Sequence, residues 1–132
     1  MGYQIKNSFP DVPVYGLRDN GSQIAFKAVT RTPKIEFLLK DCLQFLHECE
    51  YPLSNDIDVV EFSQNEVLGL AEDDKILLSS KLFELGKKEI VRTIVEEQEH
   101  LRTGYGDNTR AFQNHWINLF ISEKENRFGH FL

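Results

Sequence analysis

The sequence lacks any apolar run long enough to cross a membrane. Its apolar stretches fall well short of the roughly 18 residues that a membrane-spanning helix needs. Residues 1–6 also lack the apolar core of a secretory signal peptide. Cysteine is scarce, since only Cys42 and Cys49 occur. These absences argue against a membrane protein and against a disulfide-stabilised secreted protein, and we expect a cytoplasmic protein.

The two cysteines lie seven residues apart on one predicted helix. At the helical rise, their Cα atoms are separated by about 10 Å along the axis. A disulfide needs Cα atoms closer than about 7 Å. We therefore expect two free thiols that behave as small hydrophobic side chains.

An excess of basic residues is also missing. The 132 residues carry a formal net charge of -6, whereas a general nucleic-acid-binding protein normally shows a basic face. Internal repeats and low-complexity segments are absent too. Hydrophobic residues make up 41% of the chain and charged residues 27%, which is typical of one soluble globular domain. We expect no nucleic-acid partner and no membrane partner.

Periodicity and turn residues divide the chain into two parts. Residues 1–20 are predicted to form an irregular arm with one short strand at 12–17, and Asn20-Gly21 is a hairpin turn signal. Residues 21–132 are predicted to form a single domain. Its elements follow in the order strand 23–30, helix from Pro33 to about Glu50, strand 58–62, hairpin strands 67–70 and 75–79, and helix 81–102.

The end of the long helix and the start of a last helix are marked by small and polar residues. Gly104 suits the left-handed C-cap position, and Gly86 weakens the long helix without ending it. Asp107 or Asn108 is the expected N-cap of the last helix. That helix carries an apolar stripe at helical spacing, made by Phe112, Trp116, Leu119 and Phe120. The predicted fold class is α+β, a small, mostly antiparallel sheet with about three packed helices.

Negative charge is concentrated where a helix tolerates it least. Glu96, Glu97 and Glu99 lie in the last two turns of the long helix, at the negative end of its dipole. Such a departure from a local rule is a modest indication of a functional site. The ordinary explanation is a solvated surface whose charge Arg92 and Arg102 partly offset.

The segment Glu96-Glu97-Gln98-Glu99-His100 contains most of a known zinc-binding pattern. In His-Glu-x-x-His the two histidines bind the metal and the glutamate activates water. Here Glu96 replaces the first histidine, Glu97 stands at the base position, and His100 is the second ligand, one turn from Glu96. Glu97-x-x-His100 also matches the helices of di-iron proteins, but those need several such helices and this chain offers one.

A third metal ligand would come from the glycine turn or the last helix. The candidates are Asp107, Asn108 and His115, although Asp107 has an ordinary explanation as a cap and His115 as a packed or exposed histidine. Arg110 offers a different explanation, an acid–arginine network without metal. We expect no bound metal and no cofactor, and a cluster bonded within itself: Glu96, Glu97, His100, Asp107 and Arg110.

These residues carry two family resemblances. A strand at 76–79 followed by a helix ending in Glu-Glu-x-x-His-Leu-x-x-Gly resembles the minimal core of zincin metallopeptidases. Over residues 24–122 the chain is similar to the C-terminal region of certain bacterial ATP-binding proteins with an upstream histidine-kinase/gyrase-type ATPase domain, in which Glu-Glu also replaces His-Glu. Three motifs carry this second resemblance, and they begin at Leu78-Ser79, Glu96-Glu97 and Asp107-x-x-Arg110. The chain lacks the ATP-binding asparagine and Asp-x-Gly-x-Gly, so the resemblance implies no ATP binding here.

The resemblance implies a zincin-like domain with a degenerate motif. The leading hypothesis is a non-catalytic protein-interaction or regulatory C-terminal domain of a larger bacterial ATPase, with that ATPase domain or another protein as its partner. The alternative is a metal-dependent hydrolase with Glu96 and His100 as ligands and Glu97 as general base. A stand-alone protein-binding domain unrelated to any ATPase is the third possibility.

Overall fold

The computed structural model describes residues 14–17 and 23–129. Most of the predicted arm at 1–20, together with the Asn20-Gly21 turn, lies outside the described residues. The described strands are β1 (Val14–Leu17), β2 (Gln23–Ala28), β3 (Asp56–Phe62), β4 (Gly69–Glu72) and β5 (Lys75–Ser79). The helices are α1 (Pro33–Glu48), the 3-10 helix η1 (Ser80–Glu84), α2 (Lys87–Thr103) and α3 (Arg110–Phe128).

The strands form one mixed sheet in the order β1-β2-β3-β5-β4. Three of its pairings are antiparallel, and β3 pairs with β5 in parallel. The parallel pair arises because the chain leaves β3, forms the predicted hairpin of β4 and β5, and inserts β5 next to β3. The α+β class is therefore confirmed, with a sheet that is mixed because of this one parallel pairing.

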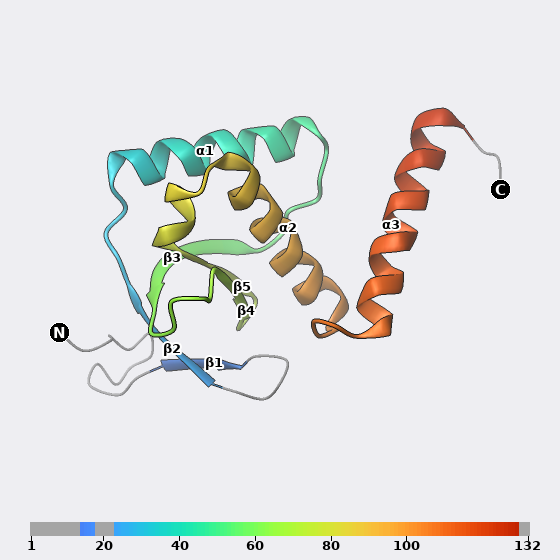
Figure 1. The fold of residues 1–132 in the computed structure, drawn as a ribbon. Helices are drawn as coiled ribbons and strands as arrows, with labels where there is room; N and C mark the ends of the chain where they lie inside the picture. Colours follow the sequence, from blue (N-terminus) through green and yellow to red (C-terminus); the bar gives the residue numbers. More distant parts are fainter. Residues whose placement is uncertain (1–13, 18–22, 130–132) are drawn as a thin grey trace.

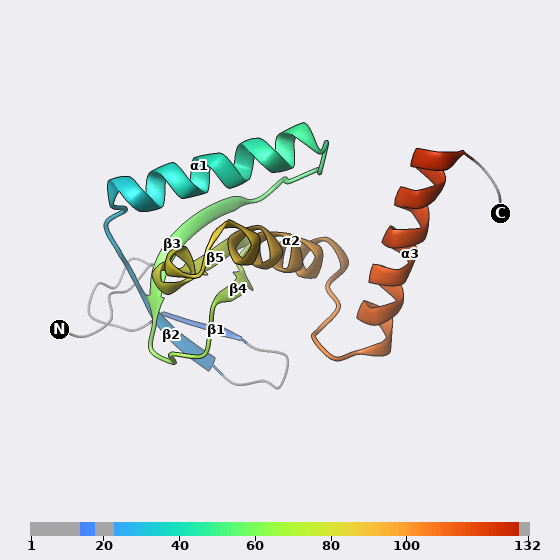
Figure 2. The same cartoon turned by 45° about the horizontal axis from the view of Figure 1, so that its top comes forward.

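Both faces of the sheet are buried, and consecutive residues of a strand point to opposite faces. Ile76 and Leu78 pack under α1 and α2, whereas Leu77 between them packs on the other side. Figures 1 and 2 show α1 and α2 crossing the same face of the sheet. The core beneath them includes Leu39 and Ile94, each at most 4% exposed. Alternation along β5 thus supplies two cores.

The helix predicted at 81–102 is wrong at its start. Gly86 has φ of 109°, a backbone conformation that a helix does not contain, so the chain forms η1 first and α2 begins only at Lys87. Ser79 is the N-cap of η1, and its hydroxyl accepts the Lys81 N–H. Gly86 separates two helices because glycine alone adopts this conformation easily.

The end of α2 follows the prediction, and the start of α3 does not. Gly104 adopts the left-handed conformation with φ of 73°, and its N–H donates to the His100 carbonyl at 2.8 Å. The N-cap of α3 is Thr109, whose hydroxyl accepts the Phe112 N–H at 3.1 Å. The predictions of Asp107 or Asn108 as the cap are wrong, and Asp107 is thereby available for other contacts.

Helix α3 stands away from the rest of the molecule (Figures 1 and 2). Phe112 is its one buried residue among those described, whereas Ile117 is 55% exposed and Phe120 63% exposed. The predicted apolar stripe exists in sequence, but only its first residue is buried. None of the described helices is both long enough and apolar enough to cross a membrane.

Candidate functional site

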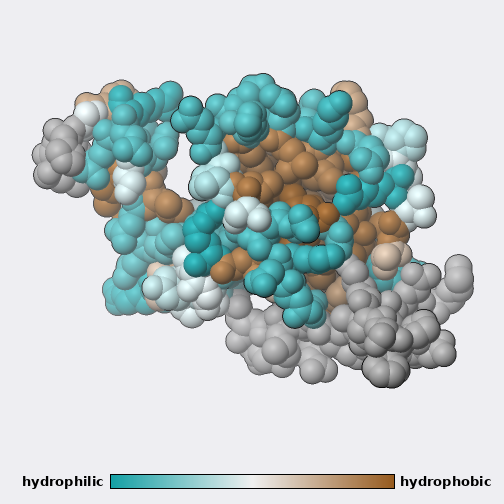
Figure 3. Space-filling view, turned by 180° about the vertical axis from the view of Figure 1, so that it is seen from behind, coloured by the Kyte–Doolittle hydropathy of each residue, from teal (hydrophilic) through white to brown (hydrophobic). Residues whose placement is uncertain are grey.

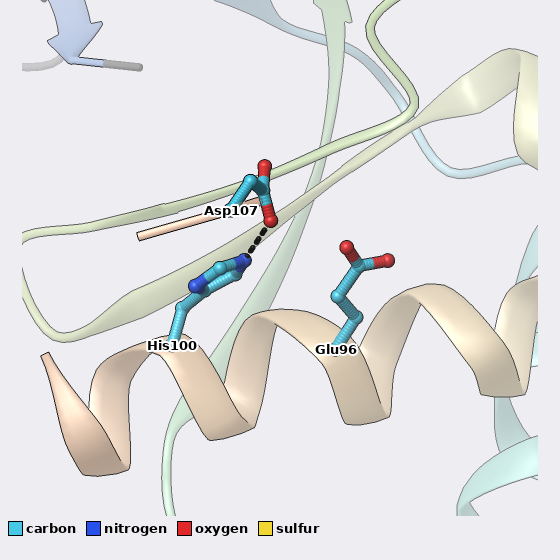
Figure 4. Close-up of side chains that lie close together, drawn as sticks. All are labelled: Glu96, His100 and Asp107. Atoms are coloured by element: carbon cyan, nitrogen blue, oxygen red, sulfur yellow. Dashed lines mark hydrogen bonds and ion pairs between the residues drawn. The ribbon is translucent and has the colours of Figure 1, made fainter. Parts of the chain in front are cut away.

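Helix α2 presents three different faces to its surroundings. One face carries Ile90 and Ile94 into the core under α1. A second face carries Thr93 and Glu97 against Gly69 of β4. The third face includes Glu96 and, one turn further on, His100, and it carries both side chains toward Asp107 (Figure 4). Because a helix repeats every 3.6 residues, the segment from Glu96 to His100 reaches more than one of these faces.

The structure brings Glu96, His100 and Asp107 together. One ligand-type atom from each of them lies within 4.8 Å of the other two. Glu96 and His100 stand one turn apart on α2, and Asp107 comes from the turn that Gly104 starts (Figure 4). Asp107 was one of three candidates for the third ligand, and here it is the one that joins the pair.

The imidazole of His100 makes three contacts that fix its position, and its side chain is 10% exposed. Its Nδ1 lies 2.7 Å from the carbonyl oxygen of Tyr105, and its Nε2 lies 2.5 Å from Oδ1 of Asp107. The ring of Phe112 stacks on it with a centroid distance of 4.2 Å and an angle of 13° between the planes. The ring orientation is therefore fixed by two polar contacts and one aromatic contact.

Both ring nitrogens of His100 face oxygen atoms that can only accept. A neutral imidazole has one N–H, so it can satisfy one of these oxygens. Both oxygens are satisfied at once only if the ring carries a second proton or if one nitrogen binds a metal ion. Burial lowers the pKa of His100. The Tyr105 carbonyl and the negative charges of Glu97 and Asp107 raise that pKa by more than burial lowers it, so the pKa lies above its ordinary value of 6.5. The surroundings of His100 therefore favour a positive charge on or next to the imidazole.

Glu97 lies beside this cluster in a pocket of about 190 Å³. The pocket is lined by one side of β4, by the end of α2 and by the turn that follows, including Gly69, Leu70, Ala71, Glu97, His100, Tyr105 and Asp107. Gly69 allows α2 and β4 to approach closely, since a Cβ there would lie 3.3 Å from Oε2 of Glu97 and would collide with Thr93. A carboxylate, an imidazole and a strand backbone therefore share one cavity.

Glu99 belongs to a separate, buried network. Its side chain is 1% exposed and receives hydrogen bonds from the Tyr51 hydroxyl and the Arg102 guanidinium. Nε2 of His115, on α3, lies 2.7 Å from Oε1 of the same carboxylate. Burial and the Glu99 carboxylate raise the pKa of Tyr51 far above its ordinary value. Glu99 therefore has a structural role. Its partners explain why one of the three glutamates lies at the end of α2, without any metal.

The sequence also predicts Arg110 and His115 as site residues. Arg110 is exposed, and its place in the cluster stays a prediction. The arginine that pairs with Glu99 is Arg102 of the same helix. His115 contacts Glu99 instead of the Glu96 cluster.

Sequence reasoning missed Tyr51 and Gly69. Tyr51 lies 48 residues from Glu99, and nothing in the local pattern connects the two. Gly69 stands in a predicted strand, where an isolated glycine indicates a close backbone approach, and that signal would have pointed to α2.

Comparison with known proteins adds no relative. No protein-family model, no curated protein and no solved structure matches the chain. The function is therefore argued from the geometry of the site.

Proposed function

We propose that the chain is a metal-dependent hydrolase, in which Glu96, His100 and Asp107 hold a divalent cation and Glu97 is the general base. The observation that carries the proposal is the position of Asp107. The sequence alone offers two ligands on one helix, which is too few for a catalytic site that holds its metal through three protein ligands. The turn after α2 adds the third donor, a carboxylate oxygen of Asp107, on the same side.

The donor set suits a divalent metal ion. Two carboxylates and one imidazole are ligands that Mn²⁺, Fe²⁺ and Zn²⁺ accept. The contact of His100 Nδ1 with the Tyr105 carbonyl also supports the proposal. Histidine ligands commonly donate one ring N–H to a backbone carbonyl, which leaves the other nitrogen free to bind the metal. In this structure that other nitrogen is the one facing Asp107.

Each residue of the site has a role that its position allows. A bound metal ion would polarise the scissile carbonyl and lower the pKa of a coordinated water. Glu97, in the adjoining pocket, accepts the proton of the attacking water and passes it to the leaving group. Gly69–Ala71 of β4 line the same pocket with strand backbone, so an extended peptide paired along β4 would bring a peptide bond to Glu97. Peptides are therefore the substrate class that we propose.

Metal binding is tested by titrating protein purified with a chelator. Zn²⁺ and Mn²⁺ are added separately in a calorimeter, and we expect one equivalent to bind at micromolar affinity or better. Asp107→Asn should weaken binding about 10-fold or more, because it removes a charged donor. Asp73→Asn, in the exposed β4–β5 turn, is the matched control and should bind as the wild type does. Absence of saturable binding would end the proposal.

Hydrolysis is tested with a peptide library and the metal-loaded protein. Glu97→Gln should abolish cleavage while metal affinity stays within about two-fold, because Glu97 is placed as the base and not as a ligand. Cleavage that survives Glu97→Gln would contradict the assigned role. A library left intact by the wild type with zinc, manganese and cobalt would contradict hydrolysis itself.

A second candidate function is a protein-interaction or regulatory domain, carried by the exposed apolar residues of α3. Ile117, Leu119 and Phe120 are between 38% and 63% exposed, and such a helix face is typical of a binding surface. The resemblance described above suggests an upstream ATPase domain as the partner. This function predicts that an ATPase domain is encoded upstream in the same reading frame, and that calorimetry with it shows binding that Phe120→Glu abolishes. Binding without any metal affinity would favour this function over hydrolysis.

A further inference from the structure

A groove between α2 and α3 begins at the proposed metal ligand Glu96. It has a volume of about 480 Å³ and is lined by Arg92, Val95, Glu96 and Trp116. Arg92, Val95 and Glu96 share one face of α2, at i, i+3 and i+4, and Trp116 faces them from α3. Figure 3 shows open space between α3 and the body of the molecule.

The groove is continuous with the catalytic cluster, because Glu96 belongs to both. The wall of the groove formed by Trp116 is positioned by the contacts that attach α3 to α2. The Trp116 ring meets Phe112 edge-on at a centroid distance of 5.5 Å and lies 6.0 Å from the His115 ring. Phe112 in turn stacks on His100. Trp116 is thus placed relative to the metal ligands by a chain of aromatic contacts.

We infer that this groove is the specificity subsite of the enzyme and that it binds an aromatic side chain of the peptide substrate. The inference rests on the proposed function, and it names which substrates that function selects. The volume falls within the range of about 300–1,000 Å³ that is usual for ligand sites. Since Glu96 lies at the groove, a side chain bound there belongs to a residue close to the scissile bond.

The lining favours an aromatic ring over other side chains. Val95 and the Trp116 indole supply apolar surface, and an indole packs well edge-on or offset against a second ring. Arg92 contributes a guanidinium whose charge is already partnered, since Nη1 lies 3.2 Å from Oε1 of Glu89. A paired guanidinium makes a poor anion site but still favours the face of an aromatic ring. A negatively charged substrate side chain would meet Glu96.

Binding is tested by NMR, because Trp116 is the one tryptophan of the sequence and gives a single indole N–H signal. N-acetyl-L-phenylalaninamide and N-acetyl-L-alaninamide are titrated separately into the metal-loaded protein. We expect a saturable shift of the indole signal with the phenylalanine compound, and at least about 10-fold weaker binding of the alanine compound. Equal shifts, or no shift with either compound, would overturn the inference.

Selectivity is tested with peptides that differ only in one aromatic residue. Trp116→Ala should raise KM about 10-fold for peptides with phenylalanine next to the scissile bond, leave kcat nearly unchanged, and barely affect alanine peptides. Trp116→Phe should restore most of the preference. Phe37→Ala removes an aromatic ring from α1, where it is 63% exposed and does not line the groove, and is the control. An unchanged aromatic preference in Trp116→Ala would contradict the subsite.

The two tests distinguish a failure of the aromatic subsite from a failure of the proposed hydrolysis. If the wild type binds metal but cleaves no peptide, hydrolysis fails, and the indole titration still decides whether the groove binds aromatic compounds. If cleavage occurs without aromatic preference, hydrolysis stands and the subsite fails.

Discussion

The carboxylate of Glu99 shows how one buried charge can join three parts of the chain. It is 1% exposed and is bonded to Tyr51 before β3, to Arg102 on its own helix and to His115 on α3. A carboxylate removed from water needs such partners, because an unpaired charge in the interior is very costly. These partners explain how the C-terminal end of α2 can carry the negative charge of Glu99, independently of the cluster of Glu96, His100 and Asp107.

Replacing Tyr51 with phenylalanine should destabilise the protein. Tyr51→Phe removes one hydrogen bond to a buried carboxylate, and we expect the free energy of unfolding to fall by about 1–2 kcal/mol. Urea denaturation measures the change as a lower midpoint with an unchanged slope. Tyr105→Phe is the control, because the Tyr105 side chain is 44% exposed, and it should change stability by less than about 0.5 kcal/mol. Equal losses in both variants would contradict the role given to Tyr51.

The two thiols should differ sharply in reactivity. Cys49 is exposed, whereas Cys42 is 1% exposed and burial raises its pKa above the ordinary 9.0. At pH about 8 we expect iodoacetamide to modify Cys49 quickly and Cys42 only after unfolding, as measured by mass spectrometry. The Cys49→Ser variant should show no fast reaction. Modification of both thiols at one rate would contradict the buried position.

The same pKa shift has a consequence for stability. In the unfolded chain Cys42 loses its proton near pH 9.0, while the folded protein keeps it. Above that pH the unfolded state binds fewer protons, so the contribution of Cys42 to stability is present below about pH 9 and is lost as the pH rises further.

Among the elements, β4 and α2 make the contact that shapes the pocket. Gly69 of β4 faces Thr93 and Glu97, and the absence of a side chain at Gly69 lets the strand lie directly on the helix. The Thr93 hydroxyl is bonded to the Glu89 carbonyl at 2.8 Å, so its methyl group is held toward the strand. The position of Glu97 in the pocket therefore depends on a glycine in a neighbouring strand.

A double-mutant cycle tests this contact. Gly69→Ala should lower the free energy of unfolding by about 1–3 kcal/mol, because the new methyl group collides with that of Thr93. Thr93→Ser removes the methyl group and keeps the hydroxyl, so the double variant should lose less stability than the two single losses added together. Urea denaturation gives all four values. Additive losses would show that the two groups do not meet.

Across the whole molecule, α3 is attached through few side chains. Phe112 packs on His100, and His115 bonds to Glu99. The rest of the helix is largely exposed in the part of the chain that the structure describes. An isolated helix of this length with few alanines is only marginally stable in water, so the two contacts must supply most of its order. Because the turn before α3 carries Asp107, the attachment also affects the cluster of Glu96, His100 and Asp107.

Removing Phe112 should release α3 without unfolding the domain. In Phe112→Ala we expect amide exchange across residues 110–128 to speed up about 10-fold or more, while α1 and α2 keep their protection. Hydrogen exchange with mass spectrometry reads each segment separately. Phe120→Ala, at a residue 63% exposed, is the control and should leave exchange unchanged. Faster exchange throughout the chain would mean that Phe112 supports the whole core.

Local patterns predicted most elements of the fold but few of the contacts between them. Pro33 begins α1 as expected, and the hydroxyl of the preceding Thr32 accepts the Ile35 N–H. Gly104 ends α2 in the left-handed conformation, also as expected. These features depend on neighbouring residues. The break at Gly86 and the cap at Thr109 were missed, because helix periodicity on both sides of Gly86 continues in sequence and three adjacent residues before α3 are all good caps.

The sequence by itself determined that Glu96 and His100 lie close together, because 3.6 residues per turn place i and i+4 on one side of any helix. Only the tertiary structure decided which residues complete the site. A positive φ at Gly104 and again at Asn108 turns the chain back on itself, and this brings Asp107 to His100 while Arg110 stays in solvent. Loop dihedral angles are not periodic, so no spacing in the sequence could have shown that the third donor was present.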